Sequence, residues 1–279
     1  MIDLHIHTTA SDGQYSPAQI AGMAKNAGLT MFAITDHDTI AGIEEGLNAA
    51  RAFGIGFIGG MEISVQGNRE LHILGYGIDP QNPELLSLCE EFAEGRRRRG
   101  GRILEYLRDY GICLDLEQAQ KYALGELLGR PHFARALVDA GHVKTTREAF
   151  DKYLGIPAFD RVERPKPLPA QGIKVINDAG GIAVLAHPVQ LNLSDADLEK
   201  LLRELIQHGL GGIECYYSAH TPRQTELYLS LARTYGLAVT GGSDFHGEKI
   251  KPEVLLGTGI NGSLNISEDD VSVFMKYSV

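Results

Sequence analysis

The chain has 279 residues, of which 43% are hydrophobic and 22% are charged, and its formal net charge is −10. These values are typical of a globular protein with a sizeable core, and the length allows one α/β domain or a domain with an insertion. The negative charge argues against a protein that coats nucleic acids, although bound cations can reverse the sign of a local site.

The sequence also carries signals about location. Cys89, Cys113 and Cys215 form no CxxC pair, and we interpret them as idle thiols in a reducing compartment. No signal peptide is visible, and no apolar run approaches the ~20 residues that span a bilayer. We therefore expect a cytoplasmic protein that does not contact membranes and needs no obligate protein partner.

Short apolar runs alternate with helical patterns over the first 80 residues. Strands are predicted at 2–4, 31–34, 55–58 and 71–76, and helices at 16–28 and 40–53. Ser16 and Pro17 supply the cap and the first residue of the first helix. The alternation favours a mainly parallel sheet or barrel.

Helical periodicity replaces the strand signals between residues 83 and 159. One or two long amphipathic helices are predicted at 85–107, and further helices at 116–124, 132–140 and 146–154. We interpret 83–159 as a helical insertion that forms part of the substrate pocket, and 1–82 together with 160–279 as the barrel domain. The prolines of 164–169 forbid a continuous helix there. Beyond them, strands are predicted at 182–186, 212–215 and 237–240, and helices at 196–208 and 221–235.

Histidines and carboxylates recur where the predicted strands end. The set consists of His5, His7, Asp12, His37, Glu62, His72, His187, Asp244 and His246. His5 and His7 stand two apart on a strand and can point to the same side. Most of the others lie in or just after a strand, at the rim where barrel enzymes build their sites. Nitrogen and oxygen ligands without thiolate suit zinc, manganese or iron.

A structural interpretation stays open for single members of this set. His72 alone could be a satisfied core histidine, and Asp12 before a glycine could form an Asx-turn. Asp244 alone could be a turn or cap residue. Together, the nine residues would be costly to desolvate without a metal ion.

Several of these residues lie in short motifs. The motifs are Asp3-Leu4-His5-Ile6-His7-Thr8, Ser11-Asp12-Gly13, Ile34-Thr35-Asp36-His37-Asp38, Gly60-Met61-Glu62, Ala186-His187-Pro188 and Gly242-Ser243-Asp244-Phe245-His246. From residue 2 to about 260 the chain thereby resembles the PHP family, the polymerase and histidinol phosphatase domain. The helical insertion resembles the branch of nucleotide-bisphosphate phosphatases and RNase AM-like exoribonucleases.

The resemblance implies a distorted (βα)7 TIM-like barrel that holds two or three divalent ions, Mn2+, Zn2+ or Fe2+. Carried over by motif, the ligands form three groups: His5, His7, Glu62 and Asp244; Glu62, His72 and His187; and Asp12, His37 and His246. Glu62 would bridge the first two ions. The expected nucleophile is a metal-bound hydroxide held by Glu62, His5, His7 and Asp244.

The resemblance further implies a hydrolase of phosphate esters whose substrates are 3′,5′-nucleotide bisphosphates, with pAp giving AMP and phosphate. Trimming of short 5′-phosphorylated RNA in the 5′-to-3′ direction is a related activity. Two alternatives stay open: a histidinol-phosphate phosphatase, disfavoured by the insertion, and a non-catalytic metal-binding module, disfavoured by the complete ligand set.

Substrate contacts are predicted in two places. Arg130 and His132 precede a helix of the insertion, and Arg130 could grip a second phosphate in bidentate fashion. His220 follows a strand and could contact the substrate or protonate the leaving group. A surface arginine, a helix-end histidine and a loop histidine are the plain alternatives.

Charged neighbours of the site carry two more expectations. Asp3, Asp36 and Asp38 are expected to hydrogen-bond the ligand imidazoles. The run from Arg96 to Arg99 points all round a helix and is interpreted as a solvated face, with RNA contact as the alternative.

Overall fold

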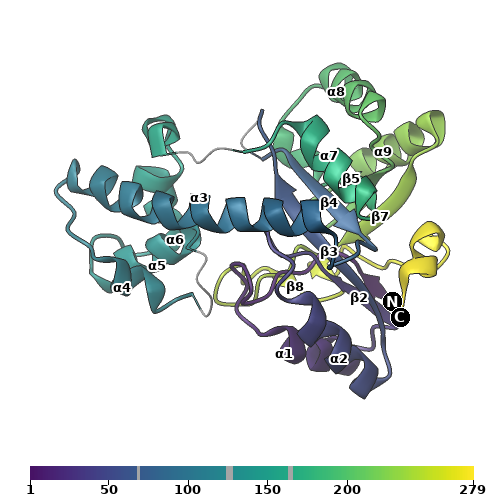
Figure 1. The fold of residues 1–279 in the computed structure, drawn as a ribbon, viewed down its shortest axis with the longest axis horizontal. Coiled ribbons are helices and arrows are strands. Elements are labelled where there is room, and N and C mark those ends of the chain that lie inside the picture. The colour runs from purple at the N-terminus through teal and green to yellow at the C-terminus, as the bar shows by residue number, and fades with distance from the viewer. Residues whose placement is uncertain (68–69, 124–127, 163–165) are drawn as a thin grey trace.

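Seven strands form one sheet, with β1 to β7 adjacent in chain order (Figure 1). The strands are β1 (Ile2–Asp3), β2 (Met31–Ile34), β3 (Gly56–Ser64), β4 (His72–Tyr76), β5 (Ile182–Leu185), β6 (Gly212–Tyr217) and β7 (Ala238–Gly242). The computed structural model describes residues 1–67, 70–123, 128–162 and 166–279. The sheet nearly closes, because the amide of Leu4 donates to Gly241 O over 3.1 Å and the amide of Asp244 donates to His5 O over 2.8 Å. This barrel-shaped sheet confirms the predicted fold class.

The direction of β4 departs from a parallel barrel. β1, β2 and β3 pair in parallel, as do β5, β6 and β7, but β4 is antiparallel to both of its neighbours. The link between Val65 and Leu71 is too short for a crossover, and β3 and β4 therefore form a hairpin. As a result, His72 at the start of β4 lies opposite Ser64, at the edge where the parallel strands end.

Two of the observed strands, β3 and β1, end at residues other than those predicted. β3 continues to Ser64 instead of ending at residue 58, so Glu62 lies within the strand and does not follow it. Gly60 lies within this longer strand, where the neighbouring strand approaches so closely that a Cβ would lie 2.6 Å from the carbonyl oxygen of Gly75. β1 ends at Asp3, before the two histidines.

Helices cover the outside of the barrel (Figure 1). They are α1 (Pro17–Asn26), α2 (Ile43–Phe53), α7 (Pro169–Asp178), α8 (Asp195–Gln207) and α9 (Pro222–Tyr235). α7 was not predicted: Pro169 stands at its first helical position, where a missing amide costs nothing, and so begins the helix. Residues 164 and 165 of the proline-rich stretch lie outside the described residues. The remaining short elements are η3 (Pro188–Leu191), β8 (Val254–Leu255), β9 (Gly259–Ile260) and η4 (Ser272–Tyr277).

One apolar cluster fills the inside of the barrel. It consists of alternate residues of β1 to β5 and of further residues that include Phe274 of η4. The ring of Tyr76 packs at 5.1 Å from Phe274, and its hydroxyl donates to Leu4 O over 2.9 Å. The inside is therefore a packed core, which leaves only the rim for a site.

The described parts of residues 83–162 extend from one side of the barrel (Figure 1), and the start of this segment, at Leu85 and Phe92, packs in the same apolar cluster as Ile63 and Ile173 of the barrel. The segment forms α3 (Pro83–Arg108), α4 (Leu116–Gln120), α5 (Arg130–Asp139), α6 (Thr146–Ala149), the π-helix η1 (Phe150–Leu154) and the 3-10 helix η2 (Pro157–Val162). α3 is a single helix of 26 residues. α4 ends at Gln120, and residue 124 of its predicted span lies outside the described residues. A separate apolar cluster between residues 103 and 162 supports the assignment of an insertion, which stays a prediction. None of the described helices has the length and apolarity needed to cross a membrane.

Candidate metal centre

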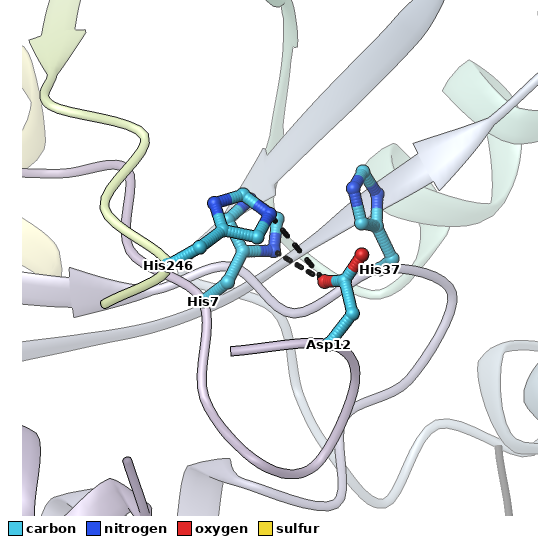
Figure 2. A group of neighbouring side chains, drawn as sticks. All are labelled: His7, Asp12, His37 and His246. Carbon is cyan, nitrogen blue, oxygen red and sulfur yellow. Dashed lines mark ion pairs between the residues drawn. The ribbon is translucent and has the colours of Figure 1, made fainter. Parts of the chain in front are cut away.

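All nine predicted ligands meet at the rim of the barrel. Their nitrogen and oxygen atoms form four overlapping groups, in each of which the atoms lie within 4.8 Å of one another. The groups are His7, Asp12, His37 and His246; His5, His7 and Asp244; His5, Glu62 and His187; and His37, Glu62 and His72. In the first group the carboxylate of Asp12 faces the imidazoles of His7 and His246 (Figure 2). The long-range convergence that the sequence predicted is therefore present.

Glu62 lies at the middle of the centre. Its Oε1 is 2.9 Å from His72 Nδ1 and 2.8 Å from His187 Nε2. Its Oε2 is 3.0 Å from His37 Nδ1 and 3.2 Å from His7 Nε2. One carboxylate with each oxygen facing a different set of imidazoles has the geometry expected of a bridging ligand.

Unpartnered polar atoms test whether the centre suits metal ions. Nε2 of His5 and Nε2 of His7 face each other at 3.2 Å. Among the described residues, buried atoms without a hydrogen-bond partner include His7 Nδ1, His37 Nδ1, Glu62 Oε2 and His187 Nδ1. Buried polar groups are normally satisfied, and a divalent cation is the partner that imidazole and carboxylate donors share. The donor set therefore fits metal ions.

The electrostatics keep the acids ionised. Burial by itself would raise the pKa of Asp12, Glu62 and Asp244, but the neighbouring imidazoles, together with an ammonium beside Asp244, hold each pKa well below its usual range. Burial lowers the pKa of His72 to about 4. At His7, burial is outweighed by hydrogen bonds and charges from Asp244 and Glu62, which raise the pKa to about 9. The centre therefore gathers negative charge that a cation can neutralise.

Glu214 of β6 hydrogen-bonds two of the proposed ligands, and this residue was not predicted. It is fully buried, its Oε1 accepts from His5 Nδ1 over 2.9 Å, and its Oε2 accepts from the amide of His187 over 2.6 Å. This contact fixes the tautomer of His5 and leaves Nε2 free to bind a metal ion. An acid inside the apolar run Gly212 to Cys215 was a signal that could have identified it.

Asp3 and Asp36 were expected to hydrogen-bond the imidazoles of the proposed ligands, but their carboxylates accept hydrogen bonds from other groups. Asp3 accepts from the Ser243 amide over 2.8 Å and hydroxyl over 2.6 Å. Asp36 accepts from both the amide and the hydroxyl of Thr8, each over 2.7 Å. These acids tie the ligand-bearing loops together through hydroxyls and amides.

Asp244 is held by two residues that no sequence pattern indicated. Lys251 Nζ lies 2.6 Å from its Oδ2, and the hydroxyl of Tyr217 donates to the same oxygen over 2.9 Å. Asp244 and His187 both have left-handed backbones, with φ of 57° and 26°. Strained conformations of this kind concentrate at functional sites. Gly242 allows the approach of β7 to β1, because a Cβ there would lie 2.3 Å from His5 N.

The three residues predicted to contact the substrate lie in different surroundings. Arg130 lines a cavity of 270 Å³ that opens onto the metal centre. His132 is buried and accepts from the Gly129 amide over 2.9 Å, which caps α5 just before Arg130. His220 Nδ1 donates to Cys215 O over 2.9 Å, and burial lowers the pKa of this histidine. Neither histidine is among the residues that line this cavity, and their substrate roles stay predictions.

The arginine run is not a uniformly solvated face. Arg97 and Arg98 are exposed, but Arg96 and Arg99 are buried. The prediction was wrong for these two because one side of α3 packs toward the barrel loops, where Arg96 pairs with Asp38.

Comparison with known proteins shows the class of protein to which the chain belongs. The PHP domain family matches residues 3–156. A 3′,5′-nucleoside bisphosphate phosphatase of Chromobacterium violaceum is 35% identical over 249 residues, which cover 88% of this chain and 87% of that protein. A 5′-3′ exoribonuclease of Haemophilus influenzae is 37% identical over 247 residues, covering 88% and 89%.

Two further proteins extend this comparison. A phosphoribosyl 1,2-cyclic phosphate 1,2-diphosphodiesterase of Eggerthella lenta is 33% identical over 256 residues, covering 88% and 94%. A crystal structure from Bifidobacterium adolescentis, described as a metal-dependent phosphoesterase, is 31% identical, with a TM-score of 0.86 and coverage of 100% and 96%. The fold and the site define the class as metal-dependent phosphoesterases, hydrolases that act on phosphate esters. The chain belongs to the PHP domain family.

Proposed function

We propose that the protein removes the 3′-phosphate from 3′,5′-nucleotide bisphosphates, converting pAp to AMP and phosphate, and trims short 5′-phosphorylated RNA in the 5′-to-3′ direction. One observation carries the proposal: a single cavity of 270 Å³ joins the metal-centre residues to cations of other segments. The cations include Arg130 and Arg135 of α5 and Lys249 beyond β7. A substrate with more than one phosphate matches this arrangement.

The proposed ligands are divided among three ions. They are His5, His7, Glu62 and Asp244 for the first, Glu62, His72 and His187 for the second, and Asp12, His37 and His246 for the third. Divalent ions bound there would lower the pKa of a coordinated water and stabilise charge on the phosphate oxygens. Manganese, zinc and iron(II) all suit these donors.

The protein's own residues hold this arrangement in place. Glu214 keeps the proton of His5 on Nδ1, away from the centre. Lys251 and Tyr217 fix one oxygen of Asp244, so the other oxygen, which lies 3.3 Å from His7 Nε2, points into the centre. Rigid ligands of this kind place the substrate phosphate within reach of the activated water.

The wall of the cavity favours a nucleotide over histidinol phosphate. Pro131, Phe150 and Ile250 form an apolar part of the lining. An aromatic ring beside cations suits a nucleobase attached to a phosphorylated sugar. Histidinol phosphate carries a positive amine and a single phosphate, and would bring that amine toward Arg130 and Arg135.

A panel assay tests the proposal. Phosphate release and product formation would be measured with pAp, AMP, short 5′-phosphorylated RNA, histidinol phosphate and phosphoribosyl 1,2-cyclic phosphate, each with manganese and with zinc. We expect pAp and the RNA to be hydrolysed fastest. Preference for histidinol phosphate or the cyclic phosphate, or no turnover of any substrate, would overturn the proposed specificity.

Ligand variants provide the matched control. His7→Ala or Asp244→Ala should abolish turnover while the far-ultraviolet circular dichroism spectrum stays that of the wild type. His142→Ala removes an exposed histidine of the insertion and should retain full activity. Full activity in either ligand variant would remove its assigned role.

A further inference from the structure

Two loops of the barrel rim meet at the surface beside the site of the proposed third ion. The first loop follows β1 and carries Asp12, and the second follows β7 and carries His246. Nε2 of His246 lies 3.4 Å from Oδ1 of Asp12, and the two side chains face each other (Figure 2). The distance between these two proposed ligands therefore depends on how closely two separate loops approach.

Hydrogen bonds join the two loops beside these ligands. The amide of Gln14 donates to His246 O over 2.7 Å. The side-chain oxygen of Gln14 accepts from the amide of Lys249 over 2.8 Å, and its side-chain nitrogen donates to Glu248 Oε1 over 3.2 Å. The hydroxyl of Tyr15 donates to the same oxygen of Glu248. We call the side chains of Gln14, Tyr15 and Glu248 the loop clasp.

Packing beside the clasp brings the loops together on both sides of His246. Gly247, which follows it, has a φ of 101°, and a Cβ there would lie 2.3 Å from Cβ of Gln14. Glycine permits both this backbone conformation and this close approach. The ring of Tyr15 stacks on that of Phe245, which precedes His246, with the ring centres 6.3 Å apart and the planes inclined by 5°. The first loop thus lies against both chain neighbours of a proposed ligand.

The ions that Glu62 would bridge are supported in a different way. Glu214, which hydrogen-bonds two of the proposed ligands there, is fully buried. Tyr217, whose hydroxyl holds Asp244, is also buried. The clasp residues, by contrast, are half-buried or exposed, so water competes for their hydrogen bonds. The spacing of the two loops is therefore the more easily altered part of the centre.

We propose that the loop clasp positions Asp12 and His246 for the third ion, and that this ion depends on the clasp whereas the ions bridged by Glu62 do not. The inference rests on the ligand groups of the proposed function. The clasp residues are positioning residues, which act through the two ligands. They order the loops before the ion arrives, so ion binding does not have to supply the free energy of that ordering.

Variants that keep the size of the side chain test the clasp. Gln14→Met removes both side-chain hydrogen bonds of the glutamine, and Tyr15→Phe removes one hydroxyl. Tyr235→Phe is the matched control, because it removes a hydroxyl that donates to Glu199 between α9 and α8. Asp12→Ala removes a proposed ligand of the third ion and serves as the reference.

Metal binding is the measurement, and it does not depend on turnover. The metal-free proteins would be titrated with manganese, and the bound ions counted at each free concentration by elemental analysis. We expect Asp12→Ala to bind one ion fewer than the wild type. Gln14→Met and Tyr15→Phe should weaken binding of that ion about threefold to tenfold, as expected from a lost hydrogen bond, and leave the other ions within about twofold. Tyr235→Phe should match the wild type.

The ion counts separate failure of the clasp from failure of the proposed function. Wild-type affinity for every ion in both clasp variants, or equal losses at all ions, would overturn the clasp. An unchanged ion count in Asp12→Ala would overturn it too, because no ion would then depend on these loops. A wild type whose third ion responds to the clasp variants as expected but that leaves pAp intact would overturn the proposed function alone.

Discussion

The guanidinium of Arg96, on the longest helix of the insertion, donates a hydrogen bond to the carboxylate of Asp38, the residue that follows His37 in the barrel. Arg96 Nη2 also lies 3.4 Å from His37 O. Asp38 has a left-handed backbone with φ of 58°, and it accepts from the Ser64 amide over 2.9 Å. The pair therefore ties α3 to the loop that positions a proposed metal ligand.

Removal of this arginine should destabilise the protein. Arg96→Gln removes the guanidinium that pairs with the fully buried carboxylate of Asp38, and breaking a buried ion pair from one side costs about 3–5 kcal/mol. The free energy of unfolding in urea measures the loss. Arg97→Gln removes an exposed neighbour and should change stability by less than about 0.5 kcal/mol. Equal stabilities of the two variants would show that the pair has no structural role.

Glu214 should control metal affinity without touching a metal ion. Glu214→Gln keeps the size of the side chain but removes the charge that orients His5 and bonds the His187 amide. Loss of such supporting contacts typically weakens metal binding about tenfold to a hundredfold. Titration of the metal-free protein with zinc or manganese measures the change. Glu199→Gln is the control, because this half-buried glutamate of α8 accepts from the Tyr235 hydroxyl and is not among the described residues that contact the proposed ligands; an equal effect there would contradict the assignment.

Removal of metal ions should lower thermal stability. Each ion present at a hundredfold its dissociation constant adds about 3 kcal/mol to the folded state. We expect EDTA to lower the Tm of the metal-loaded wild type, and excess manganese to restore it. In His7→Ala the difference between the two conditions should shrink. A wild-type Tm that does not respond to EDTA would argue against resident metal ions.

His132 should make stability depend on pH. Burial lowers the pKa of this histidine to about 4 in the folded protein, below its ordinary value of 6.5. Its contribution to stability is therefore complete above pH 6.5 and is lost as the pH falls toward 4, because the unfolded chain binds the proton first. Between pH 7 and pH 5 the loss from this one group is about 2 kcal/mol.

The matched variant is His132→Gln, which keeps an acceptor for the Gly129 amide but does not titrate. Urea unfolding at pH 7 and pH 5 should show the wild type losing about 2 kcal/mol more than the variant. A parallel response of both proteins would mean that His132 is protonated in the folded state.

Local sequence patterns determined the fold class and the proposed ligands. Apolar runs with flanking helical periodicity fixed most strands, and strand ends in a barrel share one rim, so residues as distant as His5 and His246 could be expected to meet. The spacing of His5 and His7 predicted both imidazoles on one side, and their Nε2 atoms lie 3.2 Å apart although β1 ends at Asp3. The fold class and the meeting of these side chains are confirmed, because both depend on backbone periodicity, which neighbouring residues dictate; the roles of the side chains as metal ligands stay a prediction.

Contacts between distant segments were decided only by the tertiary structure. Nothing near Lys251 or Tyr217 in the chain indicates that both bond one oxygen of Asp244. The burial of Arg96 and Arg99 depends on which side of α3 faces the barrel, and four consecutive helical residues give no local signal for that choice. Strand periodicity thus predicts the rim where the proposed ligands meet, whereas the support of those side chains and the shape of the pocket arise from packing between distant segments.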